Sequence, residues 1–193
     1  MTIAEAVKYL ESHGVEDARY SARELFLEIG GVSRSDLLLG RSACDSEELI
    51  SAIRRRGERE PLQYIIGWTD FYRERYRVSE DCLIPRSDTE LLVDIAVRSI
   101  PSGERFADLC CGSGCVGIST LKNTRETKAV MVDISPAAVE LARRNAEENG
   151  VVDRAELAVM DVLSELPSGE LFAVLSNPPY VTEAEYGALS VLK

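Results

Sequence analysis

The sequence has little that would suit a membrane, an export signal or a nucleic-acid backbone. Its apolar runs are far shorter than the roughly 20 residues that cross a bilayer, and its start, Met1-Thr2-Ile3-Ala4-Glu5, lacks the basic and apolar parts of a signal peptide. We therefore expect a cytoplasmic protein. The 22 basic and 33 acidic residues give a formal net charge of −11, which disfavours tight non-specific binding to phosphate backbones.

The residues that most often bind metals are few or poorly spaced. The single histidine, His13, lies far along the sequence from most of the cysteines, and the 5 cysteines form no Cys-x-x-Cys pair. Cys110, Cys111 and Cys115 cluster beside glycines, a context unlike a secreted disulfide framework. We therefore expect reduced thiols and no metal site.

With 193 residues, 45% of them hydrophobic, the chain can form one full domain and a small one. Residues 1–66 show helical patterns and predict a small bundle that acts in substrate recognition. Thr2 and Ser33 are expected to cap helices, and Asp45 with Glu48 resembles a capping box. Residues 67–86 predict a hairpin connection, with strands at Phe71-Tyr72 and Tyr76-Arg77-Val78, after a break in the helical pattern at residues 61–67.

Residues 87–193 alternate strand and helix patterns, which predicts an α/β, Rossmann-like domain. The fourth apolar run, residues 171–176, reads as a buried parallel strand. A crossover sheet with strand order 3-2-1-4 is expected, and such sheets bind ligands at the carboxyl ends of their strands. The predicted strands are residues 105–109, 129–132, 155–160 and 171–176, and the main helices follow Pro85 and span residues 137–149.

The turn after the first strand is rich in glycine. Gly112, Ser113 and Gly114 let the backbone approach a ligand closely, and the next helix presents free N–H groups. Gly117 completes the spacing of a dinucleotide site, so spacing alone leaves a Rossmann oxidoreductase open.

Two acidic residues narrow the choice of cofactor. Asp133 ends the second strand, where a carboxylate can accept the hydroxyls of a ribose. Asp108 ends the first strand, where it would repel a pyrophosphate but could pair with the ammonium of an amino acid. This combination favours S-adenosylmethionine over a dinucleotide. Asp161, at the tip of the third strand, is either an acceptor for the adenine amine or an acid that caps a loop.

The stretch Asn177-Pro178-Pro179-Tyr180 follows the fourth strand. Its two prolines stiffen the turn and remove two backbone donors, leaving carbonyls to accept other hydrogen bonds. With a neighbouring amide and aromatic ring, such a turn suits a planar substrate that bears an NH2 group. The alternative is an ordinary turn that ends a strand.

Taken in order, these segments resemble the signature of protein-(glutamine-N5) methyltransferases of the HemK/PrmC type. That family methylates the glutamine of the Gly-Gly-Gln motif in class 1 peptide chain release factors. Asn-Pro-Pro-Tyr is shared with nucleic-acid methyltransferases, whereas the two upstream segments are more specific. The matching residues are Pro61-Leu62-Gln63-Tyr64-Ile65 with Gly67, Ile84-Pro85-Arg86 with Thr89-Glu90, Asp108 with Gly112-Ser113-Gly114, Asp133, and Asn177-Pro178-Pro179-Tyr180.

The resemblance implies a role for each matching residue, with S-adenosylmethionine as the cofactor and a release factor as the partner. Asn177 is expected to contact both cofactor and substrate. The chain departs from the usual family pattern at Cys110-Cys111 and at Ser87-Asp88. The resemblance implies that the methionine moiety is held by Asp108, Gly112, Ser113 and Gly114, the ribose by Asp133 and the adenine by Asp161. It also implies that catalysis depends on Asn177, Pro178 and Tyr180. The substrate is expected to contact Asn177, Pro178, Pro179 and Tyr180.

Two alternatives stay open: an adenine-N6 methyltransferase acting on nucleic acid, and a truncated fragment that binds cofactor without turnover. Because members of the family continue with further strands, we expect the domain at residues 87–193 to be truncated after strand four. Weak turnover and self-association through the edge strand would follow. The basic segment from Arg54 to Arg77 is interpreted as a solvated helix end and hairpin, or else as a docking surface for an acidic partner or RNA.

Overall fold

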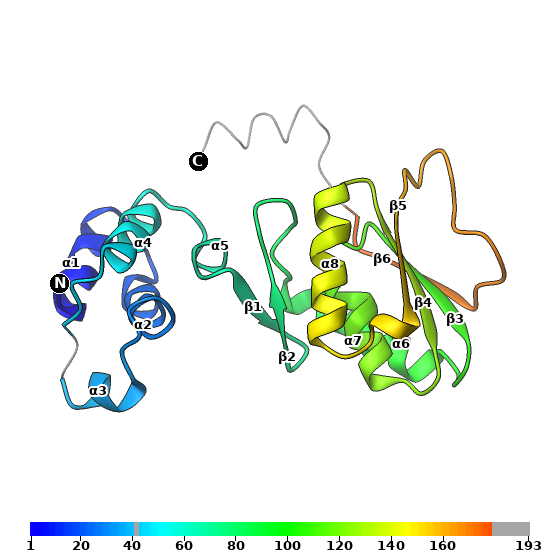
Figure 1. Cartoon of the computed structure of the whole chain (residues 1–193), viewed down its shortest axis with the longest axis horizontal. Helices are drawn as coiled ribbons and strands as arrows, with labels where there is room; N and C mark the ends of the chain where they lie inside the picture. The colour runs from blue at the N-terminus through cyan, green and yellow to red at the C-terminus, as the bar shows by residue number, and fades with distance from the viewer. Residues whose placement is uncertain (41–42, 179–193) are drawn as a thin grey trace. The chain divides into compact units, whose positions relative to one another are not determined.

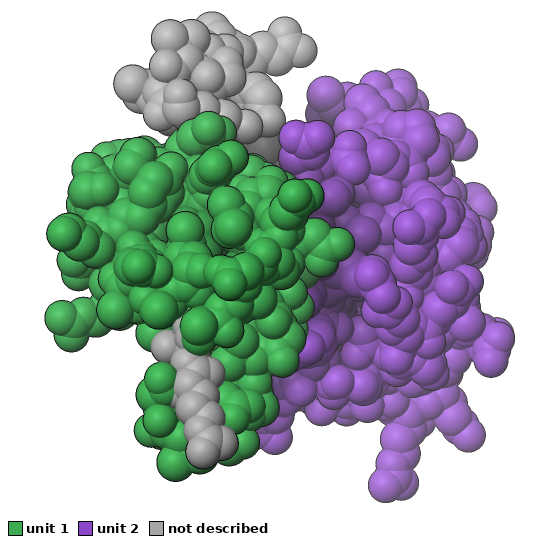
Figure 2. Space-filling model, turned by 60° about the vertical axis from the view of Figure 1, so that its left-hand side comes forward, with its two compact units in different colours: residues 1–66, 182–193 green, residues 67–181 purple. Residues whose placement is uncertain are grey.

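A computed structural model of the chain describes residues 1–40 and 43–178. The chain forms two compact units, of which the first contains Met1–Ile66 and the second begins at Gly67 (Figure 2). In the described ranges, no helix combines the length and the apolar character needed to cross a membrane. Pro179 and Tyr180 lie outside the described residues.

The first unit is helical (Figure 1). Its core includes Leu10, Leu25, Phe26 and Ile53, all fully buried, because the apolar positions of each helix recur on one face. The helices are α1 (Ile3–Ser12), α2 (Ala18–Glu28), α3 (Arg34–Leu38), α4 (Glu47–Gly57) and α5 (Leu62–Ile66).

Side-chain caps start several of these helices. The Oγ1 of Thr2 accepts from the Glu5 N–H at 3.3 Å, and Glu5 accepts from the Thr2 N–H at 2.8 Å, so the capping box at α1 is complete. The predicted cap at Asp45 is wrong: Ser46 caps α4, and the Asp45 carboxylate instead pairs with the amino group of Met1 at 2.6 Å. The nearby positive charge of the amino terminus attracts this acid away from the helix.

The connection differs in detail from the prediction. Residues 62–66 form the short helix α5, where we expected a break. Strands β1 (Trp68–Phe71) and β2 (Glu74–Arg77) form the hairpin, and Tyr72 belongs to its turn. Tyr72 and Arg73 have φ of 48° and 71°, as a two-residue hairpin turn of this twist requires.

The second unit contains a four-stranded parallel sheet of order β5-β4-β3-β6, which confirms the predicted 3-2-1-4 order. The register places Asp108 of β3 opposite Met131 of β4 and Leu175 of β6. Figure 1 shows α6, α7 and α8 gathered on one side of the sheet. The elements are η1 (Ser87–Thr89), α6 (Glu90–Ser99), β3 (Arg105–Leu109), α7 (Cys115–Asn123), β4 (Lys128–Asp133), α8 (Pro136–Glu148), η2 (Val152–Arg154), β5 (Ala155–Val159) and β6 (Ala173–Ser176).

Both faces of the sheet contain buried residues, but at the β6 edge the two faces are covered unequally. Phe106, Met131 and Leu175 pack in the core on the helical side and are at most 6% exposed. On the other face, Val174 and Phe172 are 57% and 50% exposed. The expectation of a buried fourth strand holds for the face with Leu175 and is wrong for the face with Val174, which has little packed against it within the described residues.

Candidate functional site

The turn after β3 has a backbone that favours glycine. Gly112 and Gly114 have φ of 53° and 78°, in the left-handed region. A Cβ on Gly114 would lie 2.8 Å from Cε of Met131 and 3.0 Å from Cβ of Ala142, so no larger residue fits there. Gly114 is also the N-cap of α7, so the turn leads directly into the first turn of a helix, whose Gly117 N–H donates to Asp108.

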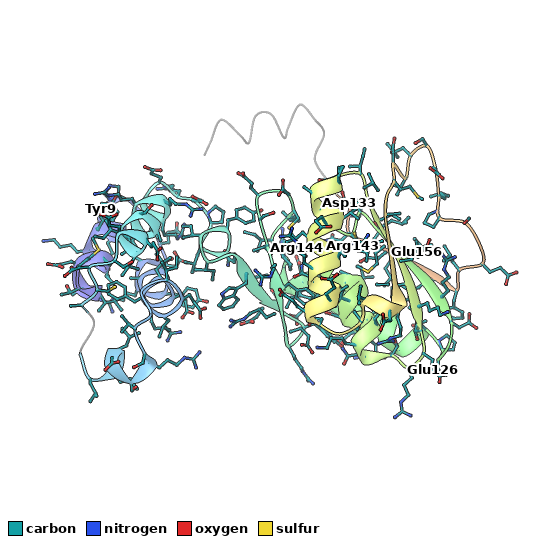
Figure 3. All side chains as sticks on the ribbon, viewed as in Figure 1. Tyr9, Glu126, Asp133, Arg143, Arg144 and Glu156 are labelled. Atoms are coloured by element: carbon teal, nitrogen blue, oxygen red, sulfur yellow. The ribbon has the colours of Figure 1, made fainter. Side chains whose placement is uncertain are left out.

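Asp133 lies at the carboxyl end of β4, close to the start of α8 (Figure 3). Its half-buried carboxylate accepts from the N–H of Gly112 at 2.9 Å and from the N–H of Ser135 at 3.0 Å. The first bond joins the end of β4 to the glycine turn, and the second joins it to the N-cap residue of α8. An ionised carboxylate has about four lone-pair sites, so the chemistry of Asp133 still fits the two hydroxyls of a ribose.

Asp108 is buried, with 2% of its surface exposed. The pKa of its carboxyl is raised to about 7, mainly by burial; the hydrogen bond from Gly117 lowers the pKa, and the charge of Asp133 adds to the increase. That bond runs from the Gly117 N–H to Oδ2 of Asp108 over 2.8 Å. A cation beside Asp108 would favour its ionised form, so this position fits an ammonium group.

A cavity of about 50 Å³ brings several predicted residues together. Asp108, Gly112 and Ser113 reach it from the end of β3, and Asn177 reaches it from the end of β6. Pockets for whole ligands measure about 300–1,000 Å³, so this cavity suits one small group at the end of a ligand. Its lining consists of Leu83, Ile84, Pro85, Thr89, Asp108, Cys110, Cys111, Gly112, Ser113, Cys115, Val116 and Asn177.

The acceptor side of the cavity begins at Asn177. Its Nδ2 donates to Oγ1 of Thr89 over 3.3 Å, which ties the end of β6 to the segment before α6. Asn177 and Pro178 are both half-buried. The sequence marked Thr89 as part of a motif, but its contact with a residue 88 positions away needed the tertiary structure.

Asp161 lies on an exposed turn after β5. Its Oδ1 accepts from the N–H of Leu163 at 3.0 Å, and its carbonyl accepts from the N–H of Ser164 at 3.0 Å. The described lining of the cavity does not include Asp161. Its carboxylate thus caps a loop here, and its role toward an adenine amine stays a prediction.

Asn145 of α8 is a residue that the sequence reasoning missed. It is fully buried, its Oδ1 accepts from the Arg77 N–H at 2.7 Å, and its Nδ2 donates to the carbonyls of Arg77 and Ser113 at 3.0 and 2.8 Å. One side chain therefore joins the hairpin to the glycine turn. The signal in the sequence is a polar residue on the apolar face of the helix, three positions after Ala142.

All 5 cysteines are free thiols. Cys111 and Cys115 are buried near Asp108, and burial raises the pKa of both, that of Cys115 to about 12. Their thiols stay protonated near neutral pH and pack as small apolar groups. Across residues 1–40 and 43–178, no group of three or more His, Cys, Asp or Glu residues could hold a metal ion.

The basic segment from Arg54 to Arg77 divides between the two units. Arg56 pairs with Asp17 at 2.7 Å, and Arg77 pairs with Glu148 at 2.6 Å. These pairs favour the interpretation as a helix end and a hairpin over a single docking surface.

The parallel sheet, its crossover order and the glycine turn define a Rossmann-like methyltransferase domain of class I, as predicted. Two family models match the chain: the PrmC N-terminal domain over residues 2–67 and the methyltransferase small domain over residues 87–191. Among solved structures, the tRNA (uracil-54, C5)-methyltransferase of Pyrococcus abyssi has a TM-score of 0.48 and 25% identity, covering 58% of this chain and 28% of that one.

Curated relatives agree with the two models. The release factor glutamine methyltransferase of Geobacter sulfurreducens is 36% identical over 94% of this chain and 64% of its own length. That of Chlorobaculum tepidum is 30% identical over 95% of this chain and 67% of its own length. The chain belongs to the family of release factor glutamine methyltransferases, and it spans less than two thirds of the first of these relatives.

Proposed function

We propose that this chain binds S-adenosylmethionine and transfers its methyl group to the side-chain amide nitrogen of a glutamine, the one in the Gly-Gly-Gln motif of class 1 peptide chain release factors. We place this reaction in the cytoplasm, where translation takes place. One observation carries the proposal: Asn177 lines the same cavity as Asp108, Gly112 and Ser113. The names of the Geobacter and Chlorobaculum relatives support the choice of acceptor.

The residues at the ends of β3 and β4 fit the cofactor. Asp108 would hold the ammonium of its methionine part, since a buried carboxylate with a raised pKa gains most from a cation. The backbone of Gly112, Ser113 and Gly114 would lie along that part, and Asp133 would accept from the ribose. When bound, S-adenosylmethionine supplies an electrophilic methyl group on a positively charged sulfur.

The residues after β6 would prepare the acceptor. An amide nitrogen is a poor nucleophile because its lone pair is shared with the carbonyl. Oδ1 of Asn177 and the carbonyl of Pro178 would each accept one N–H of the glutamine amide, which concentrates the lone pair on nitrogen and aims it at the methyl group. The bond from Nδ2 of Asn177 to Thr89 supports Oδ1 as the accepting end of this side chain.

Alignment supplies much of the remaining rate enhancement. Fixed proximity and orientation can contribute about 7–11 kcal/mol in favourable cases. No strong base is needed before the transfer, because the product nitrogen carries an acidic proton that it then releases to water. Pro179 and Tyr180 would pack against the glutamine.

Incubation of the full chain with tritiated S-adenosylmethionine tests this proposal. We expect label on a class 1 release factor and none on a variant in which another residue replaces the glutamine of Gly-Gly-Gln. Label on DNA or RNA, with a steep loss as salt increases, would instead identify a nucleic-acid methyltransferase. Cofactor binding without label on either substrate would contradict the proposed activity for this chain.

A further inference from the structure

A groove of about 800 Å³ lies in the first unit, and none of its lining residues belongs to the set proposed for methyl transfer. Three helices contribute to it: α1, α2 and α3. In Figure 2 this unit is drawn in green. The residues that line the groove are Ile3, Ala4, Val7, Lys8, Glu11, Arg19, Arg23, Leu27, Arg34, Leu37 and Leu38.

The long walls of the groove are rows of side chains spaced by four residues. On α1 the row is Ile3, Val7 and Glu11, and on α2 it is Arg19, Arg23 and Leu27. Such rows form ridges along a helix surface. At 1.5 Å per residue, each row extends over about 12 Å, which is the length of about two helical turns.

The charge of the groove is opposite to that of the chain. Lys8, Arg19, Arg23 and Arg34 line it together with one acid, Glu11, whereas the whole chain carries −11. Arg23 pairs with Glu24 at 2.8 Å. Lys8, Arg19 and Arg34 form no ion pair with any residue of the described ranges, so their charges are available to a ligand.

The apolar part of the groove includes one leucine that lies outside the unit's own core and one that packs against that core. Leu38, at the end of α3, is 89% exposed, and Leu37 beside it is half-buried. Residues 13–17 form a short link between α1 and α2, which makes these helices antiparallel neighbours. The start of α1 and the end of α2 therefore make an apolar end, and at the other end Lys8, Arg19 and Arg23 outnumber Glu11 and make a basic end.

We propose that this groove binds an amphipathic helix of a protein partner, with apolar side chains in one turn and aspartate or glutamate in the next. Helix-in-groove recognition uses apolar anchors spaced by three or four residues, and the basic end adds complementary charge. Of the described residues that line the groove, none is aromatic, so it lacks the stacking platforms by which proteins bind single-stranded nucleic acid. This binding needs neither cofactor nor methyl transfer.

Fluorescence anisotropy with a labelled helical peptide tests the proposal without cofactor. The probe is a peptide of about 18 residues, long enough to be partly helical alone, with a leucine stripe and flanking glutamates. The matched probe replaces each glutamate by lysine. We expect the full chain to bind the acidic peptide at least about tenfold more tightly, by a margin that shrinks as salt increases.

Variants then localise the binding. The double substitution Arg19→Glu with Arg34→Glu is expected to weaken binding of the acidic peptide about fivefold or more and to strengthen binding of the lysine peptide. Leu38→Asp is expected to weaken binding of the acidic peptide about tenfold, because the variant has no leucine at this position for the peptide to bury. Both changes are at exposed positions, so the fold is retained.

Matched controls lie in the second unit. Leu163→Asp replaces a leucine that is 95% exposed, and Arg98→Glu reverses an exposed arginine; both are expected to leave peptide binding unchanged. Equal affinity for the two peptides would overturn the proposal, as would an acidic peptide that binds the groove variants as tightly as the controls. A lack of methyl transfer affects neither readout, so the two proposals fail separately.

Discussion

The two halves of the candidate site are built differently. The cofactor half stands on β3 and β4, whose central residues are buried, and hydrogen bonds from Gly112, Ser135 and Gly117 hold its two acids. The acceptor half stands on β6, where Val174 is 57% exposed, and the bond from Asn177 to Thr89 ties it to the helical side. The difference teaches that the acids of the cofactor half are held by hydrogen bonds between neighbouring strands and helices before any ligand binds, whereas Asn177 is tied to a segment 88 positions away in the sequence.

The substitution with the largest expected effect tests whether the acceptor half can be impaired while the cofactor half still binds. Asn177→Ala removes an acceptor for the substrate amide, and we expect methyl transfer to fall about a thousandfold, as when one preorganised hydrogen bond is lost. Cofactor affinity measured by calorimetry should change less than about threefold. Asn123→Ala, at the end of α7, is the control. Parallel loss of cofactor binding in the Asn177 variant would show that the halves are not separable.

A second change tests the rigidity of the cofactor half. Asn145→Ala leaves the Arg77 N–H and two carbonyls without their partner, so we expect the free energy of unfolding to fall by about 2–4 kcal/mol. Cofactor affinity should also weaken, because Ser113 is no longer held. Urea denaturation measures the first effect and calorimetry the second.

Asn149→Ala is the matched control for that change. It removes a bond to the same hairpin, from Nδ2 to the Arg75 carbonyl at 3.2 Å, but it is not buried in the core. We expect a cost of about 0.5–1.5 kcal/mol and unchanged cofactor affinity. Equal costs for the two variants would argue against a special role for Asn145.

Asp108→Asn tests the charge in the cofactor half. Loss of a charged hydrogen bond to the cofactor is expected to weaken binding about 10- to 100-fold. In contrast, without cofactor the free energy of unfolding of this variant should increase relative to that of the unmodified chain as the pH rises. The pKa of about 7 in the folded chain lies above the ordinary value of 3.8, so the folded state binds this proton more tightly.

The upward shift in the pKa of Asp108 defines the pH range in which this prediction can be measured. The stability that Asp108 contributes is fully present below about pH 4 and is lost as the pH rises to about 7. The asparagine variant lacks this loss, so without cofactor its stability relative to the unmodified chain should increase between pH 4 and pH 8. Urea denaturation at both pH values measures it, and a constant difference would contradict the raised pKa.

The smallest expected effect tests the support of the acceptor half. Thr89→Val removes the hydroxyl that accepts from Asn177, and we expect the rate of methyl transfer to fall about three- to tenfold. Thr89→Ser keeps the hydroxyl and should retain most of the rate. If the valine and serine variants behave alike, the bond between Thr89 and Asn177 does not position the acceptor.

Local patterns in the sequence predicted the elements that depend on near neighbours. The helix cap at Thr2 and the end of β4 at Asp133 follow from residues a few positions apart. The strand order also followed, because short apolar runs alternating with helical patterns admit few topologies. The family resemblance then supplied the roles of the acids and of Asn177.

Distant contacts decided what those patterns left open. Asn145 meets Arg77 across 68 positions, and Thr89 meets Asn177 across 88, so no local rule pairs them. The carboxylate of Asp161 accepts from the N–H of Leu163 in its own turn, and its role toward an adenine amine stays a prediction.

The sequence by itself thus determined the helical unit, the parallel sheet and the chemical types at the strand ends, because periodicity and turn residues act locally. Only the tertiary structure decided which of those residues share a cavity, that burial raises the pKa of Asp108, and that the fourth strand exposes one face. Burial and long-range hydrogen bonds depend on the packing of elements far apart in the chain, and a linear pattern does not contain that packing.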